Sequence, residues 1–189
     1  MHIALVGHGA SLDGAGRGAE IDAAGAVLRL HDCVWHVPAD HGHRWTWGVM
    51  PGPWRNQDLA RFARDLAIRP LKGWLVYHFG QPHPKLPPQT IPVDVRFWNE
   101  QLRRLTGKPE IVVTRGFAMF ACAALLNCDK VTAYGFDAIA AGTGAGYRYH
   151  GKCANPVDEA KAARRHDFAG ERQLIERIAQ QAGMAIGFA

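Results

Sequence analysis

Short apolar runs alternate with longer amphipathic stretches along this chain. The runs are rich in β-branched and aromatic residues and are bounded by glycine, proline or polar residues, which is typical of strands. They predict strands at Ile3–Val6, Val27–Leu30, Trp45–Val49, Trp74–His78, Glu110–Val113, Lys130–Phe136 and Met184–Phe188. The amphipathic stretches predict helices at Asn56–Ile68, Val93–Leu105, Gly116–Leu126 and Asp158–Ala182.

This order of elements favours an α/β fold. The runs show little polar alternation, which indicates strands that are covered on both faces, as in a parallel sheet between helices. We therefore expect a three-layer α/β/α architecture with a mostly parallel sheet. A chain of 189 residues without visible repeats or linkers predicts a single domain over residues 1–189.

Composition and charge narrow the function classes only slightly. Hydrophobic residues make up 48% and charged residues 21% of the chain, as in an ordinary globular protein. The net charge of +5 favours an anionic ligand or partner, although the basic residues form no run. The chain starts directly with a strand-like run, so we expect neither a signal peptide nor a membrane span.

The cysteines indicate a reducing compartment. They form no C-x-x-C pair, so a zinc knuckle or a thioredoxin-like centre is not indicated. We expect buried free thiols in a cytoplasmic protein at Cys33, Cys122, Cys128 and Cys153.

A first candidate ligand loop follows the first predicted strand. The segment Ile3–Leu12 runs from the strand into a turn that contains Gly7 and Gly9. Glycines let the backbone approach a phosphate or ribose closely, and exposed N–H groups bind anions. A dinucleotide fold is an alternative, with Asp32 as the ribose-binding acid, but its fingerprint requires a third glycine where this chain has Leu12.

A second candidate loop follows Val113. Thr114 is placed to cap the next helix, Arg115 adds a cation, and Gly116 gives a ligand access to the backbone. A purely structural cap is the alternative for Thr114. In a parallel sheet the carboxyl ends of the strands meet at one edge, so we expect a crevice formed by the loops after Val6, Leu30, Val113 and Phe136.

Other chemistry is less strongly indicated. The loops Trp45–Arg55 and Gln81–Pro92 would border the ligand crevice, where their Trp and Pro residues would stack on a ligand or only pack. A histidine cluster near Asp40 has no matching carboxylate pattern for a metal, and we leave it out of the site. No D-x-D metal signature is present.

Four short motifs in order resemble those of glycosyltransferase family 29, the eukaryotic-type sialyltransferases. The large sialyl motif resembles Val6-Gly7-His8-Gly9, Gly14, Gly18, Ile21-Asp22 and Val27-Leu28-Arg29-Leu30-His31. The small motif resembles Val113-Thr114-Arg115-Gly116, Cys128-Asp129-Lys130-Val131 and Tyr134-Gly135-Phe136. The third motif falls on Arg148-Tyr149-His150, and the very small motif, H-x4-E, on His166 and Glu171.

The resemblance implies a short member of bacterial or phage type with a variant Rossmann-like (GT-A-like) fold. It implies an inverting, metal-independent transfer of an acidic sugar from a CMP-activated donor to a hydroxyl of a glycan acceptor. His166 would be the catalytic base, with Glu171 beside it. The donor nucleotide would be bound by Gly7, His8, Gly9, Ser11, Arg29, His31, Thr114, Arg115, Gly116, Gly135, Arg148, Tyr149 and His150.

The chain also departs from the family pattern. His8 and His31 stand where the family has asparagines, Arg115 replaces a threonine and Arg148 a histidine. The family's disulfide partner of Cys128 is missing, which agrees with a cytoplasmic protein. These departures keep two alternatives open: a glycosyltransferase of the same fold with another donor or an unusual acceptor, even a nucleic acid, and a non-catalytic nucleotide-binding module.

Overall fold

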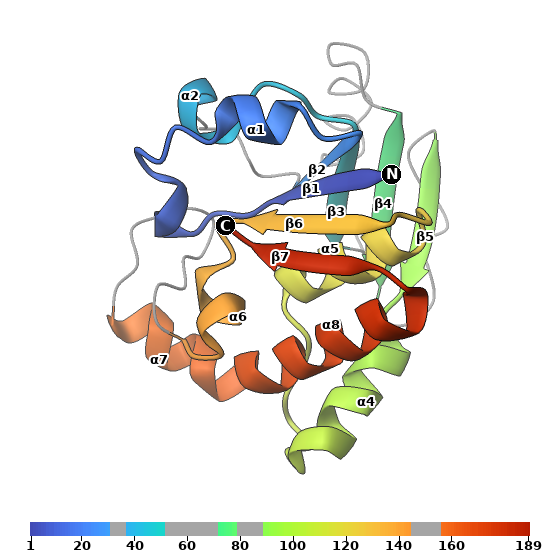
Figure 1. The fold of residues 1–189 in the computed structure, drawn as a ribbon. Coiled ribbons are helices and arrows are strands. Elements are labelled where there is room, and N and C mark those ends of the chain that lie inside the picture. Colours follow the sequence, from blue (N-terminus) through green and yellow to red (C-terminus); the bar gives the residue numbers. More distant parts are fainter. Residues whose placement is uncertain (31–36, 52–71, 79–88, 145–155) are drawn as a thin grey trace, which may run out of the picture.

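One sheet of seven parallel strands organises the protein (Figure 1). The computed structural model describes residues 1–30, 37–51, 72–78, 89–144 and 156–189. The strands lie in the order β5-β4-β3-β2-β1-β6-β7. Their bounds are β1 His2–Val6, β2 Ala26–Leu30, β3 Trp47–Pro51, β4 Gly73–His78, β5 Thr90–Asp94, β6 Lys130–Tyr134 and β7 Ala185–Phe188.

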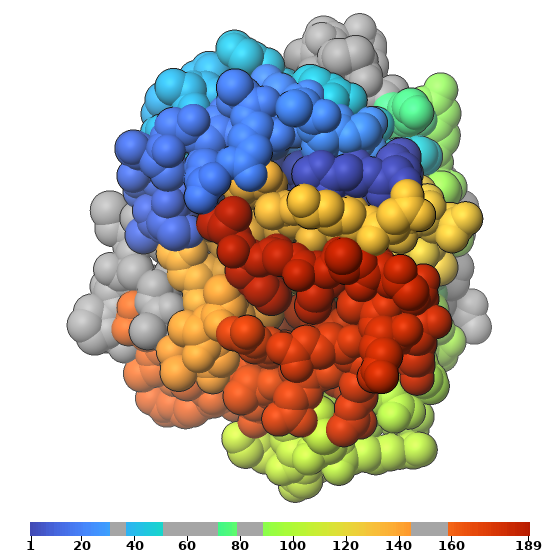
Figure 2. Space-filling model, in the orientation of Figure 1, coloured from blue at the N-terminus to red at the C-terminus, as the bar shows by residue number. Residues whose placement is uncertain are grey.

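Helices cover both faces of this sheet, which confirms the expected α/β class. In Figure 1, α1 and α2 lie on one face and α4 to α8 on the other. Their bounds are η1 Ala10–Leu12, α1 Gly18–Asp22, α2 Pro38–His41, α4 Arg96–Thr106, α5 Arg115–Ala124, α6 Asp137–Ala141, α7 Pro156–Arg165 and α8 Phe168–Ala182. Figure 2 views the side where β7 ends the sheet, with β7 and α8 in front.

The strand β1 contributes to the core on both faces of the sheet. Ile3 and Leu5 belong to the larger hydrophobic cluster, which α5 and α8 also form. Ala4 and Val6 belong to a smaller cluster that includes Ile21 of α1. Successive side chains of a strand point to opposite faces, so the four fully buried residues Ile3–Val6 of this central strand are all apolar.

Two predicted elements at the β5 edge are wrong. Residues 110–113 do not form a strand, and β5 forms instead at Thr90–Asp94, where the pattern predicts a loop and then a helix from Val93. Pro92 argued against a strand here, because proline has no N–H to donate to a ladder. It is tolerated because β5 lies at the edge of the sheet. The helix α4 consequently starts at Arg96.

The predicted helix Asp158–Ala182 is also wrong in one respect, because it is two helices. The Asp167 side chain accepts a hydrogen bond from Gly170 N at 2.8 Å and caps α8, so the chain leaves the helical conformation at His166-Asp167. The predicted helix Asn56–Ile68 lies outside the described residues. No helix in the described part of the chain is long and apolar enough to cross a membrane.

The glycine-rich stretch after η1 is fixed by one buried carboxylate. Gly14 N and Gly16 N each donate to Asp40 of α2 at 2.9 Å. Both glycines have positive φ angles, 71° and 64°, which other L-residues adopt only at a cost. These hydrogen bonds lower the pKa of Asp40 and join the first candidate loop to α2. Asp40 thus has a structural role.

We expect Gly48→Ala to destabilise the protein. Gly48 pairs with Trp74 on the next strand, and a Cβ at Gly48 would overlap the ring of this fully buried tryptophan. Overpacking of this kind costs about 1–3 kcal/mol or more. Gly187→Ala in β7 is the matched control, because nothing lies within 4 Å of its added Cβ. Urea unfolding of both variants checks this, and equal losses would contradict it.

Candidate functional site

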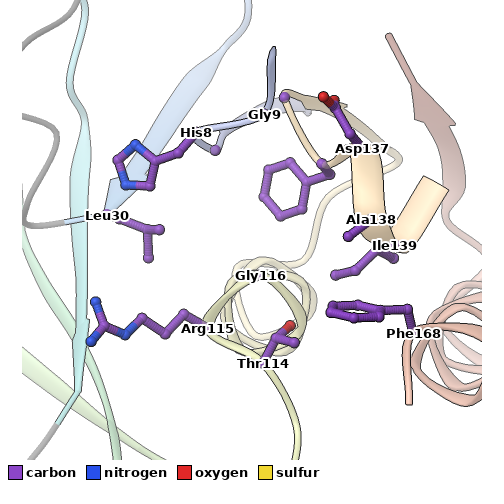
Figure 3. A pocket seen from close by; sticks show the side chains of 13 residues that line it. His8, Gly9, Leu30, Thr114, Arg115, Gly116, Asp137, Ala138, Ile139 and Phe168 are labelled. Carbon is purple, nitrogen blue, oxygen red and sulfur yellow. The ribbon is translucent and has the colours of Figure 1, made fainter. Parts of the chain in front are cut away.

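A pocket lies at the edge of the sheet where the strands β1, β2 and β6 end (Figure 3). The space between its walls, with the open mouth included, is about 640 Å³. Segments from all four expected loops or strand ends meet there. The lining residues are Gly7, His8, Gly9, Leu30, Thr114, Arg115, Gly116, Gly135, Phe136, Asp137, Ala138, Ile139 and Phe168.

The structure describes nine of the residues that the sequence analysis proposes for the donor nucleotide, and most of these nine line this pocket. They are Gly7, His8, Gly9, Thr114, Arg115, Gly116 and Gly135. Arg29 lies elsewhere, 1% exposed within β2, where its Nε donates to Arg44 O at 2.8 Å and its Nη2 to His41 O at 2.5 Å. It holds the 41–44 segment. His31, Arg148, Tyr149 and His150 lie outside the described residues.

The glycines of the first loop allow two distant loops to touch. Gly7 N donates to Tyr134 O and Gly9 N to Gly135 O, both at 2.8 Å. A Cβ at Gly7 would lie 2.5 Å from Gly135 O, and one at Gly9 would collide with Asp137. Gly135 itself has a φ of 69°. At Gly7 and Gly9 the wall of the pocket is therefore backbone, because a larger residue at either position would collide with the loop after β6.

Asp137 was missed by the sequence analysis. It is the first residue of α6, and its carboxylate accepts from Ser11 N at 3.0 Å and from the Ser11 hydroxyl at 2.5 Å. Ser11, proposed as a donor-binding residue, thus fixes this acid at the rim of the pocket. Its place directly after Tyr134-Gly135-Phe136, at the carboxyl end of a strand, was the signal that could have identified Asp137.

Polar groups are distributed unevenly around the pocket. Figure 3 shows His8 and Arg115 on one side, with Leu30 between them, and Asp137 on the opposite side beside Gly9. The amino end of α5 also faces the pocket through Thr114, Arg115 and Gly116. Helix N-termini and arginine favour anions. An anionic ligand group would therefore be stabilised near α5 and Arg115, away from the acid.

Thr114 is held from two directions. Its hydroxyl oxygen accepts from Phe117 N at 3.0 Å, which caps α5 as the sequence predicts. Its own N–H donates to Glu171 Oε1 at 2.7 Å, and its hydroxyl contacts Glu171 Oε2 at 2.6 Å. Glu171 is completely buried in α8, and burial raises its pKa to about 8. In the described structure it therefore positions Thr114 and does not line the pocket.

The segment before Thr114 is extended and depends on groups outside any sheet. Ile111 O accepts from Arg103 Nε at 3.0 Å. Val112 N donates to Arg165 O at 3.0 Å, and Val113 N donates to Asn99 Oδ1 at 2.8 Å. Buried backbone groups must be paired, and here two side chains of α4 and one backbone carbonyl of α7 take the place of a ladder. This is why a strand-like sequence forms no strand.

His166 lies in the turn between α7 and α8 and is partly buried. Its Nδ1 is 2.7 Å from Val112 O. A carbonyl only accepts, so Nδ1 carries the proton, and in the neutral ring Nε2 is then the basic nitrogen. Burial lowers the pKa of His166, although the bond to Val112 opposes this. The ring is therefore neutral at pH 7, as a general base must be.

The turn at His166 is anchored on both sides. Asp167 Oδ2 accepts from Lys108 Nζ at 2.7 Å, while its other oxygen caps α8. The His166 and Phe168 rings lie 6.0 Å apart, centroid to centroid, and Phe168 lines the pocket. His166 is not itself among the lining residues in the part of the chain that the structure describes. It stands next to the pocket.

The comparisons with known proteins agree on one family. The family model described as glycosyltransferase family 29 (sialyltransferase) matches residues 76–183, more than half of the chain. A crystal structure of a mammalian sialyltransferase is similar at 18% identity with a TM-score of 0.54. The mammalian sialyltransferase in complex with Gal-beta-1-3GalNAc-ortho-nitrophenol is similar at 18% identity and 0.56. Each match covers 98% of this chain and 68% of the other. No curated protein sequence matches the chain.

We expect Glu171→Gln to flatten the pH dependence of stability. Glu171 has a folded pKa of about 8 against a reference value of 4.5, so the folded protein retains its proton more strongly than the unfolded chain. The stabilising contribution is complete below 4.5 and is lost as the pH rises to about 8, at up to about 1.4 kcal/mol per pH unit. Glutamine imitates the protonated acid and does not titrate.

The measurement is urea unfolding of wild type and variant at pH 5, 6, 7 and 8. Glu171→Ala is the control, because it leaves Thr114 N–H buried without its acceptor and should destabilise by about 1–3 kcal/mol or more. Parallel pH profiles of the wild type and Glu171→Gln would contradict the prediction.

Proposed function

The chain belongs to glycosyltransferase family 29, and on that premise we propose that it transfers an acidic sugar from a CMP-activated donor to a glycan hydroxyl. Membership of the family makes it a sialyltransferase-like glycosyltransferase. The donor, the inversion at the anomeric carbon and the independence from metal ions are parts of the proposal. The observation that carries it is the pairing of an anion-favouring pocket with a neighbouring histidine whose tautomer is fixed.

The pocket offers a place for the donor phosphate. The amino end of α5 and the Arg115 side chain would stabilise the negative charge that develops on CMP as it leaves. Arg148 or His150 would contribute as well, according to the sequence motifs. Positive groups of this kind take the part that a metal ion has in other glycosyltransferases, and on this basis we propose a metal-independent reaction.

The proposed reaction is a single displacement. The acceptor hydroxyl oxygen forms a bond to the anomeric carbon, and the bond from that carbon to the CMP phosphate oxygen breaks. The electron pair of the broken bond leaves with CMP. His166 Nε2 takes the hydroxyl proton, because Nδ1 is already protonated and bonded to Val112 O. A positioned base of this kind contributes about 10²–10⁴ in rate.

The acceptor and the compartment are also proposals. One similar mammalian sialyltransferase was crystallised with Gal-beta-1-3GalNAc-ortho-nitrophenol, which supports a glycan acceptor for this chain. Cys122 and Cys128 are free and buried, which supports a cytoplasmic location. The replacements His8 and Arg115 keep a different nucleotide-sugar donor as the second candidate, because both change the charge or hydrogen bonding of the pocket wall.

We expect His166→Asn to lose turnover but to retain CMP binding. The asparagine amide can still donate a hydrogen bond toward Val112 O, but it cannot accept the proton of the acceptor hydroxyl. CMP release from CMP-sialic acid with a panel of galactosides, measured in EDTA, should fall by about 10²–10⁴. Calorimetry should give a CMP dissociation constant within about threefold of the wild type. UMP and GMP serve as controls for base selectivity.

The outcomes separate the candidates. If His166→Asn releases CMP as fast as an active wild type, His166 is not the base. CMP binding by the wild type without turnover of any CMP-sugar would indicate a nucleotide-binding module. Turnover of another nucleotide-sugar would support the second candidate.

The pH profile supplies a separate prediction. The proposed base must be unprotonated, so kcat should decrease as the pH falls through the pKa of His166. Burial lowers this pKa from 6.5, which places the midpoint of the acidic limb below pH 6.5. Stopped assays between pH 4.5 and 8 at saturating donor and acceptor measure kcat directly. A midpoint at or above pH 7 would contradict the assignment.

A further inference from the structure

The helix α4 makes two contacts with the segment Ile111–Thr114 from outside the pocket. Asn99 is 6% exposed and accepts from Val113 N at 2.8 Å. Arg103, one turn later on the same face, donates from Nε to Ile111 O at 3.0 Å. Neither residue belongs to any of the sequence motifs, and neither lines the pocket in the described part of the chain.

The segment that α4 holds connects the two parts of the proposed site. Val112 O bonds to His166 Nδ1, which fixes the base. Thr114 lines the pocket and starts α5, whose amino end faces the donor site. Val113 lies between Val112, which is bonded to the base, and Thr114, which lines the pocket. The N–H of Val113 is held by Asn99.

We propose that Asn99 is a positioning residue for sugar transfer, which sets the place of the His166 base relative to the donor pocket through Val113. This inference rests on the proposed function. Arg103 assists at the other end of the same segment. Because no strand among the described residues pairs with residues 111–113 in a ladder, these side chains fix what a sheet would otherwise fix.

The expected effect follows from the energy of one buried hydrogen bond. Without Asn99 Oδ1, Val113 N–H remains buried without this acceptor, which is unfavourable. The segment would then shift to find another partner, and Val112 O would move from His166. A displacement of about 1 Å at a reacting group can cost about 10² in rate. Because the bond to Val112 raises the pKa of His166, a weaker bond should lower it.

The experiment compares Asn99→Ala, Asn99→Asp and Arg103→Met with the control Glu100→Gln. Glu100 is exposed on α4 and pairs only loosely with Arg104, at 3.7 Å. For Asn99→Ala we expect kcat to fall about 30–100-fold, with a CMP dissociation constant changed less than about fivefold. Asn99→Asp keeps the acceptor and should recover most of the rate. Arg103→Met should act in the same direction but more weakly, and Glu100→Gln should match the wild type.

A second measurement does not depend on turnover. The pKa of His166 is read by NMR from its ring protons, assigned by their absence in His166→Asn, and should be lower in Asn99→Ala than in the wild type. An unchanged pKa together with unchanged kcat would overturn the inference. So would a loss of kcat in Asn99→Ala that follows only from loss of folded protein at the assay temperature, with the pKa unchanged. If the wild type binds no CMP and turns over no CMP-sugar, the proposed function fails, while the NMR result still tests whether Asn99 acts on His166 through the segment Val112–Val113.

Discussion

The site depends on one buried carboxyl group. Glu171 has no access to solvent, yet it contacts both the N–H and the hydroxyl of Thr114. It thereby joins α8 to Thr114 in the wall of the pocket. The helix α8 itself follows the turn that carries the proposed base, His166. Burial of an acid is tolerated here because both oxygens have partners and because its raised pKa lets it remain neutral.

The surrounding contacts extend the same constraint. The helices α4 and α8 both pack against the segment that leads into α5, and their side chains supply acceptors and donors that a sheet would have supplied. Lys108 and Asp167 then fix the turn that follows α7. The proposed chemistry therefore relies on side chains of the two helices α4 and α8, and on a backbone carbonyl of α7, to hold a short irregular segment, while the parallel sheet holds the opposite wall of the pocket.

The sequence predicts the fold where local patterns and tertiary structure agree. The central strands are apolar on both faces, and their runs end within two residues of β1, β2 and β6. Residues 110–113 carry the same pattern but bind to side chains of α4 and to the Arg165 carbonyl of α7, which periodicity cannot reveal. Conversely, Pro92 hides an edge strand, and the cap by Asp167 divides a helix whose amphipathic pattern is continuous.

The same reasoning explains which parts of the candidate site were found. Glycines and a capping threonine at strand ends carry a local signal, and they do line the pocket. The local signal of Asp137 is only its place after the carboxyl end of a strand, and Phe168 carries none that stands out from an ordinary helix start. Arg29 matches a motif position, but its side chain is engaged by backbone carbonyls inside the fold, and only a structure shows this.

The contact between the loops after β1 and β6 has a consequence for biosynthesis. Val6 pairs with Tyr134, and the Gly7–Gly9 backbone is bonded to residues that the ribosome adds much later. The pocket cannot exist while only the amino-terminal half has emerged, because one wall is not yet made. Pairing over such a separation is slow relative to local folding. If the proposed function holds, a nascent chain would thus be unable to bind the donor nucleotide until β6 and the start of α8 had left the exit tunnel.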